Sequence, residues 1–570
     1  FYSMTMTSLV VGLVALLLPS VVAVDLNAFA WQSKNEYPAP SDFPEADILS
    51  SRASSAVAFT GGGSRSYLAA LGYLAALNEL ELSNIRYMSG VSGGSWATVV
   101  YSYKQVAVSD DEFLGPILFP SELSMDKLEE MSPKCARALT DCDFVKVTLE
   151  AVKDGTVDSL AEGWAYATQK LYFEPVGIQA QVPFSWNAAT VADIRARNPS
   201  LADVVFMLPA DTSRPFPLIG TGIVGPDEGA GYAYPDRNMT FLEISPLYVG
   251  QMRSLSVGYK YHKSLHTHYK TVGGFVESYA FGLMGPGPAH GLRTGASKGT
   301  LQVPTPTAFL DLQFAAAASG YAEGAFFESL RPYNISSGLG MHLDYWSPVD
   351  RHPQSLDTLV CDGGSFENIM LPSMLQRGVK KIVLFFNSVT PLQPASDWNV
   401  KTDVPSKEQI DDGLSSLFGV LPEDYVRWEE RSFDFSKDQF FSTDEWIPFV
   451  TELQAAQQSG SGIVVTKNLT TIENSWWGIA AGLEAEITFV YLGRLASWEA
   501  QLSEEMRPLL VPAGADADDL SKTVQDGPFR HFPHYPTSGG LLGAQQANVL
   551  ADLTAWTILQ NKEIFQHMLS

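Results

Sequence analysis

Two glycine-rich turns lie close together in the chain, and they constrain its fold more than any other feature. The first turn, residues 61–63, follows the apolar run 56–59, and the second is G-V-S-G-G at residues 90–94. An apolar run that stops at glycine is typical of a buried strand. Helical patterns follow both turns, and the first of them, residues 65–80, is rich in Ala and Leu. The stretch therefore predicts two buried strands, each leading directly into a helix.

Ser92 stands at the centre of the second turn, which matches the G-x-S-x-G elbow. In such an elbow the strand turns sharply into a helix and exposes the serine hydroxyl. The glycines of the first turn lack side chains, so their backbone N–H groups can approach a negative oxygen closely. Either turn alone is also common as a plain structural feature. Together they predict that Ser92 is a nucleophile and that Gly62 and Gly63 stabilise the oxyanion that it creates.

These turns, and later segments in the same order, resemble the catalytic domain shared by cytosolic phospholipase A2 and fungal phospholipase B (lysophospholipase). G-G-G-S-R at residues 61–65 and G-V-S-G-G-S-W at 90–96 carry the resemblance first. F-L-E-I-S-P at 241–246 and V-C-D-G-G at 360–364, with Asn368 after it, continue the resemblance. It implies a patatin-like, three-layer α/β fold with a central, mostly parallel sheet, helices on both sides and a cap or lid.

The same resemblance implies the second catalytic residue and a binding residue. Asp362 matches the aspartate of the family's Ser–Asp dyad, although an aspartate before glycine is also a common turn. Arg65 matches the arginine that faces the phosphate head group, and a salt bridge at the helix start is the alternative role. The family's site requires no metal and no other cofactor.

The expected activity is hydrolysis of fatty-acyl esters of phospholipids or lysophospholipids at a membrane or micelle surface, through an acyl-serine intermediate. One alternative is an α/β-hydrolase with a Ser-His-Asp triad, for which His531, His534 and His567 lie downstream of the acid. The other alternative is a non-catalytic lipid-binding protein on the same fold. No obligate protein partner is predicted.

The net charge of -26 disfavours nucleic acid as a partner, because the phosphate backbone is itself negative. Three histidines at 262, 266 and 268 are expected to lie in a polar loop rather than in a metal site. Cys135 and Cys142 are close enough in sequence for a local disulfide in an oxidising compartment. Cys361 follows an apolar run and is expected to be a buried free thiol.

An apolar run at residues 9–24 ends near V-V-A at 21–23, which suits cleavage of a secretory signal peptide. An uncleaved membrane anchor is the alternative. The expected localisation is the secretory pathway, with a secreted or lumenal, lysosome- or vacuole-like, destination. Secretion would permit N-glycosylation, for which the candidate sites are Asn238, Asn334 and Asn468.

The rest of the chain divides around these segments. Residues 1–23 are expected to be the signal peptide, 24–50 an N-terminal segment and 51–570 a single catalytic domain. Parts of that domain have distinct expectations: a cap or lid at about 105–200, an acidic surface insertion at about 391–449, and a terminal helix at about 545–568.

Overall fold

The computed structural model describes residues 25–569 with internal gaps. The gaps are residues 35–36, 81–83, 131–134, 142–143, 212, 227–239, 260–265, 267, 323–339, 424–434, 436, 514–518 and 538–541. The expected signal peptide, Cys142 and the sequons at Asn238 and Asn334 lie outside the described residues.

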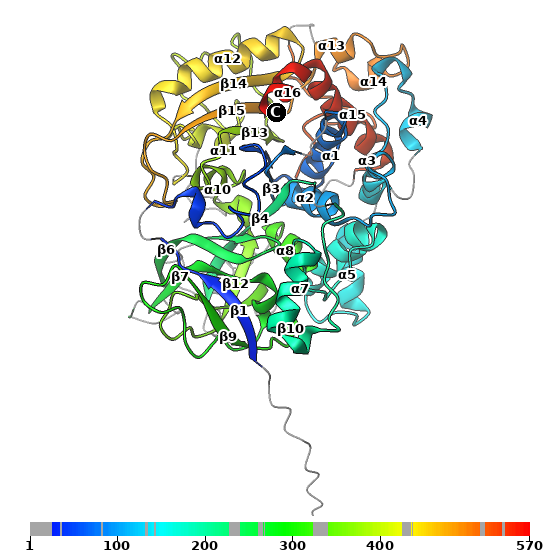
Figure 1. The fold of residues 1–570 in the computed structure, drawn as a ribbon. Coiled ribbons are helices and arrows are strands. Elements are labelled where there is room, and N and C mark those ends of the chain that lie inside the picture. Colours follow the sequence, from blue (N-terminus) through cyan, green and yellow to red (C-terminus); the bar gives the residue numbers. More distant parts are fainter. Residues whose placement is uncertain are drawn as a thin grey trace, which may run out of the picture.

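One large sheet organises the fold, and its centre is parallel (Figure 1). The five central strands are, in spatial order, β15 (Glu484–Tyr491), β13 (Lys381–Phe386), β2 (Ser55–Phe59), β3 (Tyr87–Val91) and β4 (Phe216–Pro226). Strands β2 and β3 are buried along their whole length, as the apolar runs before the glycine turns predict. The parallel centre confirms the predicted α/β class.

Antiparallel strands extend this centre in both directions. One edge is closed by β14 (Ile463–Thr470). Beyond β4 the sheet continues through β5 (Thr240–Ile244), β6 (Val249–Tyr259), β7 (His268–Val276), β1 (Asp25–Trp31) and β9 (Lys298–Pro304). Strand β12 (Leu356–Asp362) also pairs with β4, and β11 (Met341–Tyr345) pairs with β12. The N-terminal segment thus contributes a strand, β1, to this sheet.

Helices cover both faces of the parallel centre, because alternate residues of its strands enter two separate hydrophobic clusters. On β2, Val57 and Phe59 belong to one cluster, and Ala56 and Ala58 belong to the other. The first cluster contains helices α1 (Gly63–Glu79), α2 (Gly93–Tyr103), α15 (Ala544–Gln560) and α16 (Lys562–Leu569). The second contains α10 (Leu371–Gln376), α11 (Asp412–Ser416) and α12 (Trp446–Ser459). This arrangement makes the three layers that were expected.

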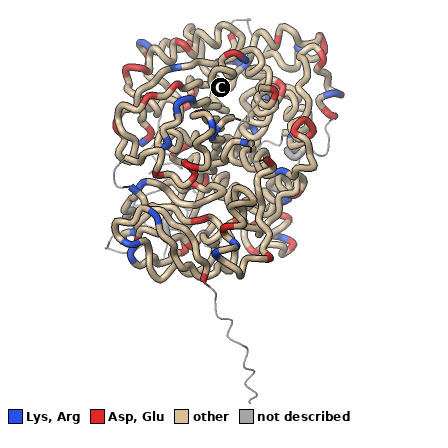
Figure 2. Tube along the Cα trace, viewed as in Figure 1, with Lys and Arg blue, Asp and Glu red and all other residues tan. Residues whose placement is uncertain are grey.

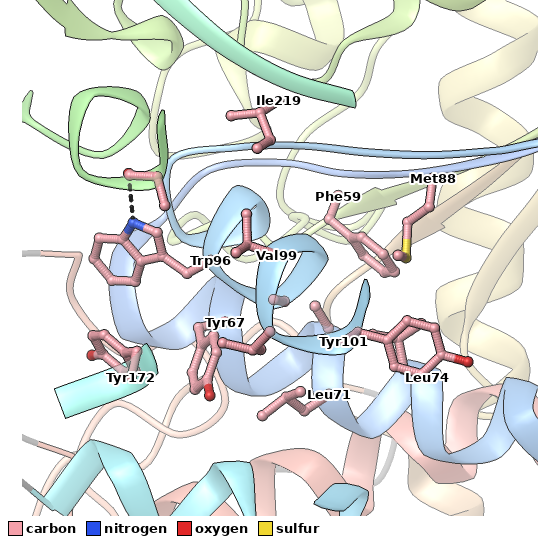
Figure 3. Packing of buried hydrophobic residues seen from close by; sticks show 14 of the residues in the cluster. Phe59, Tyr67, Leu71, Leu74, Met88, Trp96, Val99, Tyr101, Tyr172 and Ile219 are labelled. Atoms are coloured by element: carbon pink, nitrogen blue, oxygen red, sulfur yellow. Dashed lines mark hydrogen bonds between the residues drawn. The ribbon is translucent and has the colours of Figure 1, made fainter. Parts of the chain in front are cut away.

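The packing of the first cluster depends on small residues and aromatic rings (Figure 3). Phe59 and Met88 project from the sheet toward α1 and α2. Helices α1 and α15 approach closely at Gly72, where a β-carbon would lie 2.7 Å from the Cα atom of Ala551. Glycine is therefore required at this crossing, despite its low helix propensity.

Two features differ from the expectations from sequence. The described residues of 391–449 are not confined to the surface, because Leu414, Phe418 and Trp446 are buried in the second cluster. Acidic residues such as Asp411, which caps α11, lie between the buried apolar residues, so the segment reads as polar in the sequence. The expected Cys135–Cys142 disulfide is wrong, since Cys135 is a buried free thiol whose sulfur faces Gly115.

Other expectations are met or remain predictions. Cys361 is a buried free thiol, as expected. The terminal helix is present as α15 and α16, with a break at Asn561. Residues 105–200 contain several helices, among them α5 (Phe144–Lys153) and α6 (Leu160–Thr168), and their role as a cap stays a prediction.

Charged residues are spread along the described chain, with acidic positions on many elements (Figure 2). Within the described ranges, none of the helices is long and apolar enough to cross a membrane.

Candidate active site

Ser92 lies in a strained turn between β3 and α2. Its φ of 53° and ψ of −127° fall in a region that non-glycine residues rarely adopt. The turn depends on nearby glycines: a β-carbon at Gly90 would lie 2.6 Å from the backbone nitrogen of Ser95. Ser92 is 6% exposed. The structure therefore has the sharp strand-to-helix elbow that the sequence predicts.

The first glycine turn packs directly against this elbow. Gly62 and Gly63 have positive φ values of 139° and 59°, and they begin helix α1. A β-carbon at Gly93 would lie 2.8 Å from the carbonyl carbon of Gly63 and closer still to its oxygen. The N-terminal ends of α1 and α2 thus converge beside Ser92. Helix N-termini carry partial positive charge and stabilise a nearby anion.

Asp362 reaches the same place because two strands meet end to end. Strand β3 runs parallel to β4 and places Val91 opposite Gly220. Strand β12 runs antiparallel to β4 and places Asp362 opposite Thr221. Since β5 occupies the other edge of β4 at both positions, β3 and β12 share one edge. Their carboxyl ends therefore face each other, one β4 residue apart.

The side-chain surroundings agree with this backbone geometry. Asp362 is 7% exposed, and its Oδ1 atom accepts a hydrogen bond of 2.8 Å from the N–H of Gly364. A β-carbon at Gly363 would lie 3.2 Å from Val91 Cγ1, next to Ser92. The two glycines after Asp362 thus let its turn approach the elbow. The arrangement brings a hydroxyl, a carboxylate and a glycine-rich helix start into one largely buried place.

Asn368 contacts both the first glycine turn and the turn that follows Asp362. The sequence did not predict this role. Its Oδ1 atom accepts a hydrogen bond of 3.0 Å from the N–H of Gly61. A β-carbon at Gly61 would lie 2.9 Å from Ser92 Cβ, and one at Gly364 would lie 2.6 Å from Asn368 Oδ1. Asn368 lies in the segment after Asp362 that resembles the family, which marked it as a residue of interest. The sequence alone could not show which residues it contacts.

Ser319 also contacts the site, and the sequence contained no signal for it. Its hydroxyl accepts a hydrogen bond of 2.9 Å from the N–H of Ser92 and donates one of 2.6 Å to the carbonyl of Gly220. Ser319 ends helix α8 (Leu312–Ser319), which reads in the sequence as an ordinary alanine-rich helix.

Arg65 lies against the glycine turn, but it makes no salt bridge at the helix start within the described part of the chain. Its Nε atom donates to the carbonyl of Asn387 at 2.8 Å. Its Nη1 atom donates to the carbonyl of Tyr535 and, at 3.1 Å, to the hydroxyl of Thr537. Burial lowers the pKa of Arg65 to about 10. The contact with a lipid head group, implied by the family resemblance, remains a prediction.

The histidines of the alternative triad make other contacts. His534 is buried, its Nδ1 atom lies 2.9 Å from the carbonyl oxygen of Ser388, and burial lowers its pKa to about 4. His567 pairs with Glu486 at 3.0 Å, near the beginning of β15 and so at the opposite end of the strands from Ser92. The backbone N–H of His531 donates to the carbonyl of Val524. Ser92 is hydrogen-bonded to none of these side chains.

The described residues contain no group of three or more His, Cys, Asp or Glu side chains that would suit a metal ion. Of the three histidines expected in a polar loop, residue 262 lies outside the described residues and His266 is exposed.

Comparison with known proteins gives short sequence matches. No family model matches the chain. Human cytosolic phospholipase A2 delta is 39% identical over 77 residues, which are 13% of this chain and 9% of that protein. Mouse cytosolic phospholipase A2 zeta is 40% identical over 81 residues, which are 14% of this chain and 9% of that protein. The resemblance to cytosolic phospholipase A2 is thereby confirmed. The matched segments span about a tenth of the relatives' length.

The solved structures that the chain matches include those of human GIVD cytosolic phospholipase A2. One has a TM-score of 0.42 at 14% identity and covers 90% of this chain and 59% of that chain. Another, in complex with methyl gamma-linolenyl fluorophosphonate, has a TM-score of 0.37 at 14% identity, with coverages of 90% and 59%.

The expected secretory localisation is wrong, because the matched relatives are cytosolic phospholipases A2. Asn468 is exposed on β14. Its glycosylation depended on secretion, so we do not propose it.

Proposed function

We propose that the protein is a phospholipase that hydrolyses fatty-acyl esters of glycerophospholipids through a dyad of Ser92 and Asp362. The observation that carries this proposal is the end-to-end meeting of β3 and β12 on one edge of β4, beside the glycine turn. Similarity to cytosolic phospholipases A2 supports a lipid ester as substrate.

In the proposed first half-reaction, Asp362 accepts the proton of the Ser92 hydroxyl, because a neutral serine is a weak nucleophile without a base. The Ser92 oxygen then attacks the ester carbonyl. The N–H groups of Gly62 and Gly63 stabilise the resulting oxyanion, and each such donor typically contributes about 3–4 kcal/mol. The C–O bond of the ester breaks, and the lyso-lipid alcohol leaves with the proton from Asp362.

In the second half-reaction, water attacks the acyl-serine while Asp362 takes one of its protons. The second oxyanion forms at the same N–H groups. When it collapses, the fatty acid leaves and the proton returns to Ser92 Oγ. Each step uses a group of the chain as acid or base, and the dyad is regenerated.

We propose that the positive charge of Arg65 favours binding of the lipid phosphate. Its guanidinium lies against Gly62, where a β-carbon would be 3.2 Å from Cζ of Arg65. Because its Nε and Nη1 groups already donate to protein oxygens, we propose attraction of the head group rather than a free bidentate clamp.

The test is fatty-acid release from phosphatidylcholine and from lysophosphatidylcholine in mixed micelles, with and without EDTA. Ser92→Ala and Asp362→Asn are expected to lower kcat at least about 1,000-fold without changing the melting temperature by more than a few degrees. EDTA is expected to have no effect. The ratio of the two substrate rates assigns the enzyme as a diacyl phospholipase or a lysophospholipase.

His534→Gln and His531→Gln serve as the matched variants for the triad alternative. Retained activity in both agrees with the dyad. Loss of activity in a folded histidine variant, with activity kept in Asp362→Asn, would assign a Ser-His-Asp hydrolase instead. A wild-type protein that binds these lipids without cleaving them would make it a lipid-binding protein.

A further inference from the structure

One short segment contacts the backbone of both proposed catalytic residues. The N–H of Ser92 donates to the hydroxyl of Ser319 at 2.9 Å. The N–H of Asp362 donates to the carbonyl of Tyr321 at 3.3 Å. Ser319 and Tyr321 are two residues apart, whereas Ser92 and Asp362 come from different strands. The segment therefore links the two strand ends in addition to their pairing with β4.

The Ser319 hydroxyl has a fixed orientation because it both accepts and donates. It accepts from Ser92 and donates to the carbonyl of Gly220 at 2.6 Å. Gly220 is the β4 residue opposite Val91. The side chain of Ser319 is completely buried, so water does not compete for these bonds. One oxygen atom thus connects α8, β4 and the elbow.

Helix α8 is itself held at both ends. Asp311 caps its N-terminus by accepting the N–H of Phe314 at 2.7 Å. Near the C-terminus, the indole of Trp96 donates to the carbonyl of Ala316 at 3.1 Å, the contact drawn as a dashed line in Figure 3. Gly320 packs on the same indole, where a β-carbon would lie 2.7 Å from Trp96 Cζ2. The last turn of α8 therefore has little freedom to shift.

We propose that Ser319 is a positioning residue for the reaction, an inference that rests on the proposed function. Through its hydroxyl and the neighbouring Tyr321 carbonyl, this segment sets the separation between the Ser92 oxygen and the Asp362 carboxylate. A misplacement of about 1 Å costs a reaction of this kind about 100-fold in rate. Ser319 does not touch the reacting atoms, so its effect is on turnover rather than on substrate binding.

The same segment also connects the dyad to the region predicted to form the cap. The indole of Trp164, on α6, donates to the carbonyl of Ala317 at 3.2 Å. Its ring lies 5.7 Å from the ring of Tyr321. A shift of α6 would therefore be transmitted to both catalytic residues through α8. Trp164→Phe keeps an aromatic ring but removes this donor together with part of the indole.

The test compares Ser319→Ala with Ser278→Ala. Ser278 is also buried, and its hydroxyl donates to the carbonyl of Pro246 at 3.2 Å, away from the site. Steady-state hydrolysis gives kcat and KM. The rate of labelling by a lipid fluorophosphonate reports the reactivity of the Ser92 hydroxyl directly. In this reaction the bond between the Ser92 oxygen and phosphorus forms, fluoride leaves and Asp362 takes the proton.

Ser319→Ala is expected to lower kcat about 10- to 100-fold, to leave KM within about twofold, and to slow fluorophosphonate labelling by a similar factor as kcat. Ser278→Ala is expected to keep wild-type values. Ser319→Cys, which retains a weak donor and acceptor, is expected to be intermediate. Trp164→Phe is expected to lower kcat about 3- to 10-fold.

A Ser319→Ala protein with wild-type kcat and labelling rate would overturn the proposal while leaving the dyad intact. If Ser319→Ala does not fold, the folded Ser319→Cys and Trp164→Phe proteins decide, and wild-type rates in both would overturn it. If the wild-type protein shows no more hydrolysis or labelling than Ser92→Ala, both the proposed function and this inference are wrong.

Discussion

At the scale of single residues, the site depends on positions where a side chain is absent. Gly93 is the first residue of α2, and its backbone lies against Gly63. Within a helix, alanine normally stabilises relative to glycine by about 0.5–1 kcal/mol. At Gly93 this benefit is opposed by the clash with the glycine turn that we propose as the oxyanion site.

Gly93→Ala is therefore expected to reduce hydrolysis at least about 100-fold, because displacement of the Gly63 backbone misdirects an oxyanion donor. Gly413→Ala, also within a short helix, is the control, since its β-carbon would meet only the side chain of Asp411 at 3.1 Å. Activity of both variants is measured on the same micelles. Equal activities would argue against a role for the Gly63 N–H.

At the scale of elements, helix α15 carries a buried charge. The Oδ1 atom of Asp552 accepts the N–H of Leu118 at 3.2 Å and lies 3.9 Å from Arg137 Nη1. Its Oδ2 atom is buried without a hydrogen-bond partner. Arg137 directs donors to the carbonyls of Leu114 and Pro116. Desolvation therefore raises the pKa of Asp552 to about 6.

Because this pKa is raised in the folded state, the protonated form stabilises the fold below about pH 4, and that contribution is lost as the pH rises through 6. The asparagine of Asp552→Asn stays neutral at every pH, so the variant does not lose this contribution. The free energy of unfolding of the variant, relative to wild type, is thus expected to increase by up to about 3 kcal/mol between pH 4 and pH 7.

Urea denaturation at pH 4, 5, 6 and 7 measures this difference. Asp126→Asn, which removes a carboxylate from the exposed surface of α4 (Met125–Glu129), is the control for loss of charge. A difference between Asp552→Asn and wild type that stays constant across this range would contradict the assignment.

At the scale of the whole molecule, one buried arginine joins segments that are distant in sequence. Arg377 follows α10, and its Nε atom donates to Glu45 in the N-terminal segment at 2.8 Å. Its Nη1 atom donates to Glu243 of β5 at 3.0 Å, and its Nη2 atom donates to Tyr248 at 2.6 Å. The nearby carboxylates hold the pKa of Arg377 well above its usual range.

Arg377→Met is expected to lower the free energy of unfolding by about 3–5 kcal/mol at pH 7, because two buried carboxylates lose their counter-charge. Chemical denaturation of Arg377→Met and of the wild type at pH 7 measures this loss. A loss below about 1 kcal/mol would contradict it.

Much of the local structure was predictable from the sequence. The strands before the glycine turns, the elbow at Ser92 and the terminal helix follow from short patterns of residues. The sequence pattern did not predict the burial within residues 391–449, where acidic caps and surface positions alternate with buried aromatic residues such as Phe418 and Trp446. Periodicity is a weak guide in a segment of short helices and loops, because few turns repeat.

The shape of the elbow can be recognised from the sequence alone. Gly90, Ser92 and Gly93 occupy conformations and close approaches that depend on the residue type at each position, so they can be recognised locally. That Asp362 ends beside Ser92 follows only from the folded arrangement, because it depends on β3 and β12 sharing one edge of β4. The fold likewise places Ser319 against the N–H of Ser92 and the carbonyl of Tyr321 against the N–H of Asp362, since a hydroxyl at the end of a helix acquires a role only from what packs against it.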